Sequence, residues 1–185
     1  MIIQDGWLDK AHRTLSPNFD DRPPETEINL LVIHNISLPP GEFGGPWIDA
    51  LFTNTLDADA HPFFCEICNL KVSSHLLIRR SGEIIQYVSF DNRAWHAGES
   101  EFRGITRCND YSIGIELEGT DELPYEEIQY QKLAVVTRAI MKNYPAITID
   151  RITGHNNIAP TRKTDPGPAF DWVRYHSMVS DSKIA

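Results

Sequence analysis

The sequence predicts an α/β protein in which a mixed β-sheet is flanked by helices within a single domain. Three patterns indicate this fold class: a continuous apolar run at 28–34, an alternating apolar pattern at 112–118 and a helical stripe across 123–144. The length of 185 residues is enough to bury a sizeable core and leaves little room for a second domain.

The first 27 residues are polar and are interrupted by two proline-containing pairs. We therefore expect them to form an extended arm laid over the domain, with Trp7, Leu8 and Phe19 as candidate anchors. The domain itself is placed at 28–180, and 181–185 are expected to form a short C-terminal tail.

The elements of the first half of the domain alternate between strands and loops. The run 28–34 (INLLVIH) is rich in β-branched residues and Leu, which favours a central strand covered on both faces. Pro and Gly predict a loop at 38–45, and a short helix is expected at 47–53. The region 54–69 is long and irregular, so we interpret it as a flap beside a site, and the sequence leaves open whether 41–69 moves.

The second half carries the clearer periodicities. Strands at 74–78 and 83–88 are predicted to form a hairpin, and 112–118 places its three apolar residues on one face. A long helix over 123–144 ends at Pro145. A weak strand at 147–152, a loop at 154–168 and a helix at 170–178 follow, and the last helix is expected to turn Phe170, Val173 and Ser177 inward.

Charge and composition exclude several classes of protein. The chain has 17 Lys and Arg against 26 Asp and Glu, a net charge of -9, which argues against binding to nucleic acid or to an anionic membrane. No apolar run approaches the ~20 residues of a membrane span, and no secretory signal is visible. Three Cys are too few for a disulfide scaffold. We therefore expect a cytoplasmic protein, by default a monomer.

Two histidines and one aspartate stand where strands give way to loops. His34 ends the first apolar strand, His155 follows the weak strand, and Asp165 lies ten residues later. Two imidazoles and one carboxylate form a donor set that suits zinc, and three protein ligands leave a fourth position for catalysis. By spacing alone this signal is weak, because a histidine near a strand end is more often a hydrogen-bonded structural residue. His75 and His96 are weaker candidates for the metal.

Two further residues could carry acid–base chemistry. Glu116 lies on the less apolar face of its strand, where it is either a solvated residue or a general base. Lys163 lies two residues before Asp165 and could stabilise negative charge on a bound carbonyl. The pair Cys65 and Cys68 forms a single CxxC, which is weak evidence for a metal or redox motif. No GxSxG, P-loop or GxGxxG motif is present.

At these residues the sequence resembles a known family, the zinc-dependent N-acetylmuramoyl-L-alanine amidases whose fold is shared with peptidoglycan recognition proteins. The resemblance runs from about Leu31 to Trp172, and it is carried by the blocks VIHNISLPPGEFGGPWIDALF, SSHLLIRRSGEIIQYV, RAWHAG, CNDYSIGIELEGTD and TGHNNIAPTRKTDPGPAFDW. Within the family, the sequence looks most like the cytoplasmic members that act on 1,6-anhydro muropeptides during cell-wall recycling.

The resemblance implies roles for individual residues. It implies that His34, His155 and Asp165 bind zinc, that Glu116 accepts a proton and that Lys163 stabilises the transition state. It further implies cleavage of the amide between the lactyl group of 1,6-anhydro-N-acetylmuramic acid and L-alanine, with an indirect influence on β-lactamase induction. The candidate substrate-binding residues are Asn35, Lys71, Trp95, Arg107 and Arg162.

Two features depart from the family pattern. The CxxC is not part of it, and Lys71 stands where some relatives carry Arg, which presents a planar fork rather than a point charge. Two alternatives within the family stay open: a muropeptide-binding module without catalysis, and a phage-type amidase that lyses intact walls. A redox protein that uses Cys65 and Cys68 is a third alternative.

Overall fold

The computed structural model describes residues 1–181, and the last four residues of the predicted tail lie outside this range. A six-stranded mixed sheet forms its centre, in the order β12-β5-β11-β6-β7-β3. These strands are β3 (His12–Arg13), β5 (Leu30–Ile36), β6 (Leu76–Ile78), β7 (Ile84–Gln86), β11 (Ser112–Glu118) and β12 (Ile152–Gly154). The sheet confirms the predicted fold class.

Most strand pairs of the sheet are parallel. Strand β5 runs parallel to both β11 and β12, and β11 runs parallel to β6. Only the β6–β7 pair is antiparallel, which confirms the predicted hairpin. Because the carboxyl ends of β5, β11 and β12 therefore meet at one edge, side chains that follow or end these strands are brought together.

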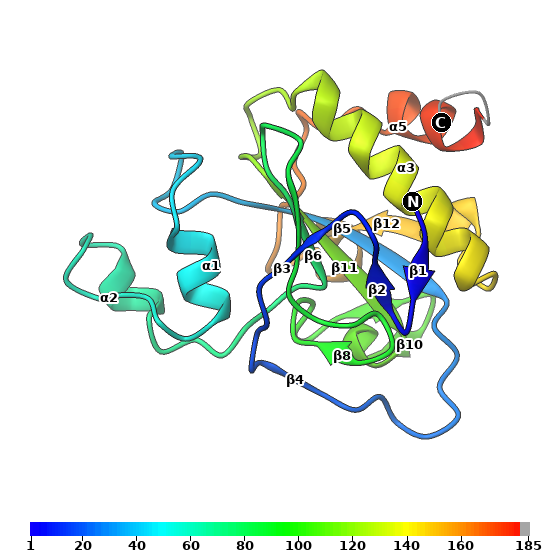
Figure 1. Ribbon diagram of the computed structural model, residues 1–185, viewed down its shortest axis with the longest axis horizontal. Coiled ribbons are helices and arrows are strands. Elements are labelled where there is room, and N and C mark those ends of the chain that lie inside the picture. The colour runs from blue at the N-terminus through cyan, green and yellow to red at the C-terminus, as the bar shows by residue number, and fades with distance from the viewer. Residues whose placement is uncertain (182–185) are drawn as a thin grey trace.

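Two helices cover one face of the sheet (Figure 1). Helix α3 (Glu127–Asn143) packs against α5 (Trp172–Ser180), and the apolar side chains between α3 and the sheet form the largest core. Helix α3 begins four residues later than predicted. Its start is fixed by a capping box in which Glu126 and Gln129 exchange side-chain and backbone hydrogen bonds.

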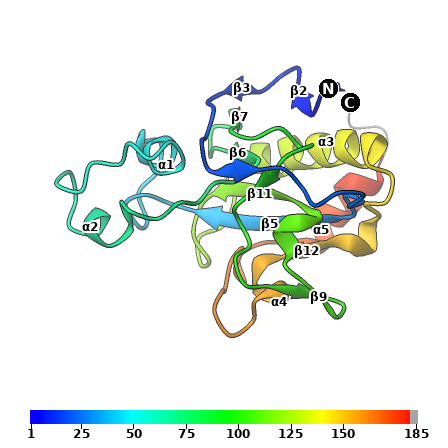
Figure 2. The same ribbon diagram turned by 90° about the horizontal axis from the view of Figure 1, so that it is seen from below.

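A lobe built on α1 (Trp47–Phe52) and α2 (Phe64–Ile67) lies to one side of the sheet, away from α3 and α5 (Figures 1 and 2). It has its own apolar cluster, which includes Ile48, Phe52 and Phe64 and continues to Leu77 and Tyr87 of the hairpin region. The expected irregular segment at 54–69 thus contains one short helix.

Shorter elements complete the fold. Three antiparallel strand pairs lie outside the central sheet: β1 (Ile3–Gln4) with β2 (Trp7–Leu8), β4 (Phe19–Asp20) with β8 (Arg93–Ala94), and β9 (Glu101–Phe102) with β10 (Ile105–Thr106). One further α-helix, α4 (His155–Ile158), and two 3₁₀ helices, η1 (Cys108–Asp110) and η2 (Ile149–Arg151), lie in the connections. No helix formed by residues 1–181 has both the length and the apolar character to cross a bilayer.

The N-terminal 27 residues contribute to the sheet itself, because β3 pairs in parallel with the hairpin strand β7. Leu8 is buried in the main core, as expected of an anchor. Phe19 is 42% exposed, so its prediction as an anchor was wrong. Its strand is held instead by its pairing with β8. The division into arm, domain and tail stays a prediction.

Three sequence predictions near the C-terminus were wrong in detail. The strand expected at 147–152 is η2 followed by β12, and His155 begins α4 rather than a loop. Helix α5 starts at Trp172, where the Asp171 side chain accepts a hydrogen bond from the backbone N–H of Arg174. This start places Tyr175 and Val179 inward and leaves Val173 83% exposed.

Candidate metal centre

His34 and Glu116 are direct neighbours on adjacent parallel strands. In the register of β5 and β11, His34 is paired with Glu116, and the two side chains project from the same face of the sheet. The opposite face carries Ile33 and Ile115 in the main core. The alternation of the two strands therefore separates an apolar face from a face that bears the polar residues of the site.

His155 reaches the same point from the next strand. Gly154, the last residue of β12, is paired with Ile33, so His155, which follows it as the first residue of α4, lies level with His34. A Cβ atom on Gly154 would lie 2.4 Å from Asn156 Oδ1 and 2.8 Å from Pro166 Cδ, so this position has no room for a side chain. Gly154 has ordinary extended backbone angles and stands directly before the first residue of α4, His155.

A backbone hydrogen bond holds Asp165 close to the start of α4, where His155 lies. The N–H of Asn156 donates to the carbonyl oxygen of Asp165 at 2.9 Å, which folds the end of the loop back onto the start of α4. The segment 156–165 is thus closed into a loop whose two ends lie side by side. This closure explains how a carboxylate and an imidazole ten positions apart point to one place.

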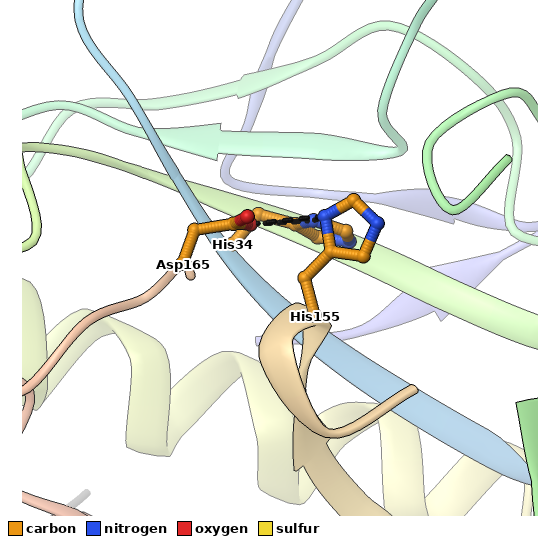
Figure 3. Close-up of side chains that lie close together, drawn as sticks. All are labelled: His34, His155 and Asp165. Atoms are coloured by element: carbon orange, nitrogen blue, oxygen red, sulfur yellow. Dashed lines mark hydrogen bonds and ion pairs between the residues drawn. The ribbon is translucent and has the colours of Figure 1, made fainter. Parts of the chain in front are cut away.

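The three side chains converge on one point (Figure 3). His34 Nδ1 lies 2.9 Å from His155 Nδ1, and Asp165 Oδ2 lies 3.1 Å from each of these nitrogens. In the part of the chain that the structure describes, this is the only group of three or more His, Cys, Asp or Glu side chains close enough to hold one ion. The predicted set His34, His155 and Asp165 is therefore brought together.

The geometry of this triangle fits a zinc ion. Ligand atoms at zinc distances of about 2.0–2.1 Å in a tetrahedron are about 3.3–3.4 Å apart. The three observed separations are within a few tenths of an ångström of one face of such a tetrahedron. Two nitrogens and one oxygen form a donor set typical of catalytic zinc, with the fourth vertex left to water or substrate.

The hydrogen-bond partner of His155 and the neutral state of the His34 ring are also compatible with metal binding. His155 Nε2 lies 3.2 Å from the carbonyl oxygen of Ala97, which can only accept, so this nitrogen carries the hydrogen and Nδ1 keeps its lone pair. Burial lowers the pKa of His34 to about 4, which keeps the ring neutral. Burial raises the pKa of Asp165, but the contacts of its carboxylate with His155 and His34 hold that pKa well below its usual range.

Glu116 is a buried carboxyl group beside the triangle. The residue is 8% exposed, and its Oε2 has no hydrogen-bond partner among residues 1–181. Burial and then the negative charge of Asp165 raise its pKa well above the ordinary value, whereas Lys163 acts in the opposite direction. A carboxyl group with a raised pKa and a free oxygen is suited to take up and release a proton.

These groups open onto a groove of about 390 Å³. Its polar end is formed by the triangle, Glu116 and the half-buried Lys163. The other wall is apolar and includes Phe63 and Ile67 of the segment 54–69, which was expected to lie beside a site, together with Leu38, Leu70 and Val72; none of these side chains was named from the sequence. The spacing of Phe63, Ile67 and Leu70 by four and three residues is the helical signal that could have found it. The groove therefore offers one polar and one apolar surface to a ligand.

The predicted substrate-binding residues do not all reach this groove. Asn35 and Trp95 line it, and Arg162 lines an adjoining hollow on the far side of Lys163. Arg107 is exposed and paired with Asp110 at 3.1 Å, and Lys71 is exposed; neither lines the groove. Their roles in substrate binding stay predictions.

The competing metal candidates are placed differently. His96 lies behind His34, with its Nδ1 2.9 Å from His34 Nε2, and His75 lies deeper in the fold. Cys65 and Cys68 are free cysteines on and just after α2. Within residues 1–181 neither the two cysteines nor His75 and His96 belong to a group able to hold a metal.

The site combines a triangle of side chains able to hold a metal with a buried carboxyl group and a lysine, and it lies at the carboxyl ends of parallel strands. This arrangement is the one expected of a metal-dependent hydrolase. Comparison with known proteins identifies the family within this class of hydrolases. Residues 24–168 match the family described as N-acetylmuramoyl-L-alanine amidase, and the chain belongs to this family.

Several relatives are similar along nearly their whole length. The chain is 65% identical over 180 residues to 1,6-anhydro-N-acetylmuramyl-L-alanine amidase AmpD of Salmonella typhimurium, covering 97% of this chain and 96% of the relative. The AmpD of Escherichia coli is 64% identical and is covered to 98%. A crystal structure of a selenomethionine derivative of AmpD superposes with a TM-score of 0.95 at 62% identity, covering 97% of this chain and all of the other.

A more distant structure contains a ligand. It is the complex of the amidase AmiD of Escherichia coli with anhydro-N-acetylmuramic acid-L-Ala-D-γ-Glu-L-Lys. It superposes with a TM-score of 0.60 at 30% identity, covering 96% of this chain and 65% of that one. The fold and the enzyme class expected from the sequence are thus confirmed.

Proposed function

We propose that this protein hydrolyses the amide bond between the lactyl group of 1,6-anhydro-N-acetylmuramic acid and L-alanine in free muropeptides. The observation that carries the proposal is the triangle of His34, His155 and Asp165 beside buried Glu116, in a chain 65% identical to an AmpD. The reaction consumes one water and releases the lactyl carboxylic acid and the free amino group of L-alanine.

The three ligand atoms of the triangle are proposed to hold one zinc ion, which supplies Lewis-acid chemistry for amide hydrolysis. Glu116 then acts as the proton carrier. Its Oε2, which has no other hydrogen-bond partner in the described chain, takes a proton from the attacking water and delivers it to the departing nitrogen of L-alanine.

Lys163 is proposed to stabilise the negative charge that develops on the lactyl carbonyl oxygen. It lines the groove with Glu116 and is close enough to influence the pKa of both Glu116 and His34. A positive charge at this place contributes most when the oxygen is charged, which is in the transition state rather than in the bound substrate.

The groove has two surfaces that match the two halves of such a substrate. Trp95 and the apolar wall offer a flat and apolar surface, and Trp95 and Asn35 are proposed to contact the sugar or lactyl part. Arg162, in the adjoining hollow, is proposed to meet the charged groups of the peptide. We further propose that the protein acts as a monomer in the cytoplasm, in the recycling of cell-wall fragments, with an indirect effect on β-lactamase induction.

The proposal is tested by substrate comparison. Purified protein with zinc is given soluble 1,6-anhydro-N-acetylmuramyl tripeptide and, separately, intact sacculi, and released peptide is quantified. We expect rapid release of tripeptide from the soluble substrate and little from sacculi. Preferential release from sacculi would identify a wall-lytic amidase, and binding without release would identify a binding module.

A further inference from the structure

Both histidines of the triangle direct their outer ring nitrogens to two consecutive residues. His34 Nε2 lies 2.9 Å from His96 Nδ1, and His155 Nε2 lies 3.2 Å from the carbonyl oxygen of Ala97. One short segment, 95–97, therefore contacts both imidazoles on the side away from the triangle. This segment belongs to the sequence block RAWHAG. The proposed reaction assigns no role to His96 of this block.

The direction of these hydrogen bonds follows from the chemistry of the atoms. If Nδ1 of His34 offers its lone pair to the triangle, its Nε2 carries the hydrogen and must donate it. His96 Nδ1 is then the acceptor, so the hydrogen of His96 lies on Nε2, which is 3.1 Å from the hydroxyl oxygen of Ser112. A one-way chain of donors runs from His34 through His96 to Ser112.

The ring of His96 packs against Gly114, at a distance that leaves no space for a side chain at position 114. A Cβ atom on Gly114 would lie 2.5 Å from both Cγ and Nδ1 of His96. Gly114 stands two residues before Glu116 on β11, on the same face of the sheet. The strand that presents Glu116 therefore leaves the space in which His96 reaches His34.

The backbone of the segment is held by one side chain. Asn109 Oδ1 accepts hydrogen bonds from the N–H groups of both His96, at 3.2 Å, and Ala97, at 2.8 Å. The Ala97 carbonyl also accepts from Arg162 Nη2 at 2.7 Å. The acceptor atoms that meet His34 and His155 are thus fixed relative to each other.

We propose that His96 is a positioning residue of the metal site, whose Nδ1 fixes His34 in the form that ligates through Nδ1. The segment 95–97, clamped by Asn109, supports both imidazole ligands. This inference rests on the proposed function, since it requires His34 and His155 to be ligands. Outer partners of ligating histidines typically change metal affinity by about 10–100-fold when they are removed.

The test measures metal binding rather than turnover. Co²⁺ and Zn²⁺ affinities are determined by competition with a chromophoric chelator, and the visible spectrum of the Co²⁺ form is recorded. We expect His96→Leu to weaken both affinities by about 10–100-fold and to change the Co²⁺ spectrum. His96→Asn can place an amide oxygen where Nδ1 was. This variant should therefore retain most of the metal affinity and most of the Co²⁺ spectrum of the parent protein.

The matched control is His75→Leu. His75 is a buried imidazole whose ring contacts the N–H of Gly114 and the carbonyl of Asn92 but does not contact the triangle. We expect this variant to lose stability while keeping metal affinity within about threefold and an unchanged spectrum. If His96→Leu does not fold, Asn109→Ala against Asn109→Asp, which keeps an acceptor oxygen, makes the same comparison.

Parental affinity and an unchanged spectrum in His96→Leu would overturn the inference, as would an equal loss in His75→Leu. Failure of the proposed function gives a different result. In that case His155→Ala would bind Co²⁺ as tightly as the parent protein, because the metal would not be held by the triangle at all.

Discussion

Glu116 stands beside His34 in the register of two parallel strands, and the two side chains share one face of the sheet. This relationship places a buried carboxyl group next to a metal-capable triangle without placing it in the triangle itself. Glu116 is therefore expected to serve proton transfer, and the triangle is expected to serve metal binding.

We expect Glu116→Gln to lower kcat by about 10²–10⁴-fold, the range typical of a lost general acid–base group, while the zinc content stays that of the parent protein. The amide fills the same space and cannot take up the proton. The measurement is turnover of an anhydro-muropeptide together with metal analysis of the same sample. Loss of zinc in this variant would instead indicate that Glu116 is a ligand.

Lys163→Ala is expected to lower kcat by about 100-fold with little change in KM, because the lost interaction forms in the transition state. Lys163→Arg keeps a positive charge at the same edge of the groove and should retain more activity than the alanine variant. Steady-state kinetics of the two variants check this. Parental turnover in Lys163→Ala would remove the lysine from the mechanism.

Arg107 is predicted to bind the peptide part of the substrate, although in the structure its side chain pairs with Asp110 outside the groove. We expect Arg107→Ala to raise KM severalfold for a substrate with a carboxylate-bearing stem and to leave kcat nearly unchanged. Kinetics with a full stem and with a single L-alanine provide the comparison. An equal effect on both substrates would contradict a contact with the stem.

The site also depends on a buried ion pair that joins the lobe to the sheet. Arg79 contacts Glu118 of β11 at 3.1 Å and Asp49 of α1 at 2.8 Å, and its side chain is only 9% exposed. We expect Arg79→Met to lower the free energy of unfolding by about 3–5 kcal/mol, because Glu118 would be left buried without its partner. Urea denaturation measures the change.

The control for this prediction is Arg103→Met. Arg103 pairs with Asp150 at the surface, where both side chains are more than half exposed, so its loss should leave the free energy of unfolding nearly unchanged. Similar losses in the two variants would mean that the buried pair adds little to the connection between lobe and sheet.

The sequence predicted the central strands well because their patterns are dictated by burial. The strand at 112–118 has the same bounds in the structure, and the run 28–34 corresponds to β5 with a shift of two residues. The register between these strands is a tertiary property. No local pattern could indicate that His34 would be paired with Glu116.

The predictions near the C-terminus were wrong in detail because these elements depend on contacts that composition does not reveal. His155 begins a short helix whose first turn is held by the hydrogen bond from the N–H of Asn156 to the carbonyl oxygen of Asp165, nine positions along the chain, and Gly154 leaves the space that Asn156 and Pro166 occupy. The phase of α5 was wrong because Phe170 packs into the core before the helix begins. In each case the outcome depends on a contact with a distant residue.

The candidate site was predicted mainly by resemblance, and the physical reason is clear. The three members of the triangle come from β5, from the start of α4 and from the loop after it, so no spacing along the chain identifies them. The individual side chains of the apolar wall and the support by His96 and Ala97 were missed for the same reason, although the segment 54–69 was expected to lie beside a site. Their function exists only once the segments have folded against each other.

The central claim is that His34, His155 and Asp165 hold one catalytic zinc ion, and metal analysis coupled to activity tests it most directly. The chelator-treated protein and the zinc-reconstituted protein are assayed on 1,6-anhydro-N-acetylmuramyl tripeptide, alongside Asp165→Ala. The account predicts one zinc per chain, no activity without it, recovery on reconstitution and neither zinc nor activity in Asp165→Ala. Full turnover by the metal-free protein, or stoichiometric zinc in Asp165→Ala, would contradict it.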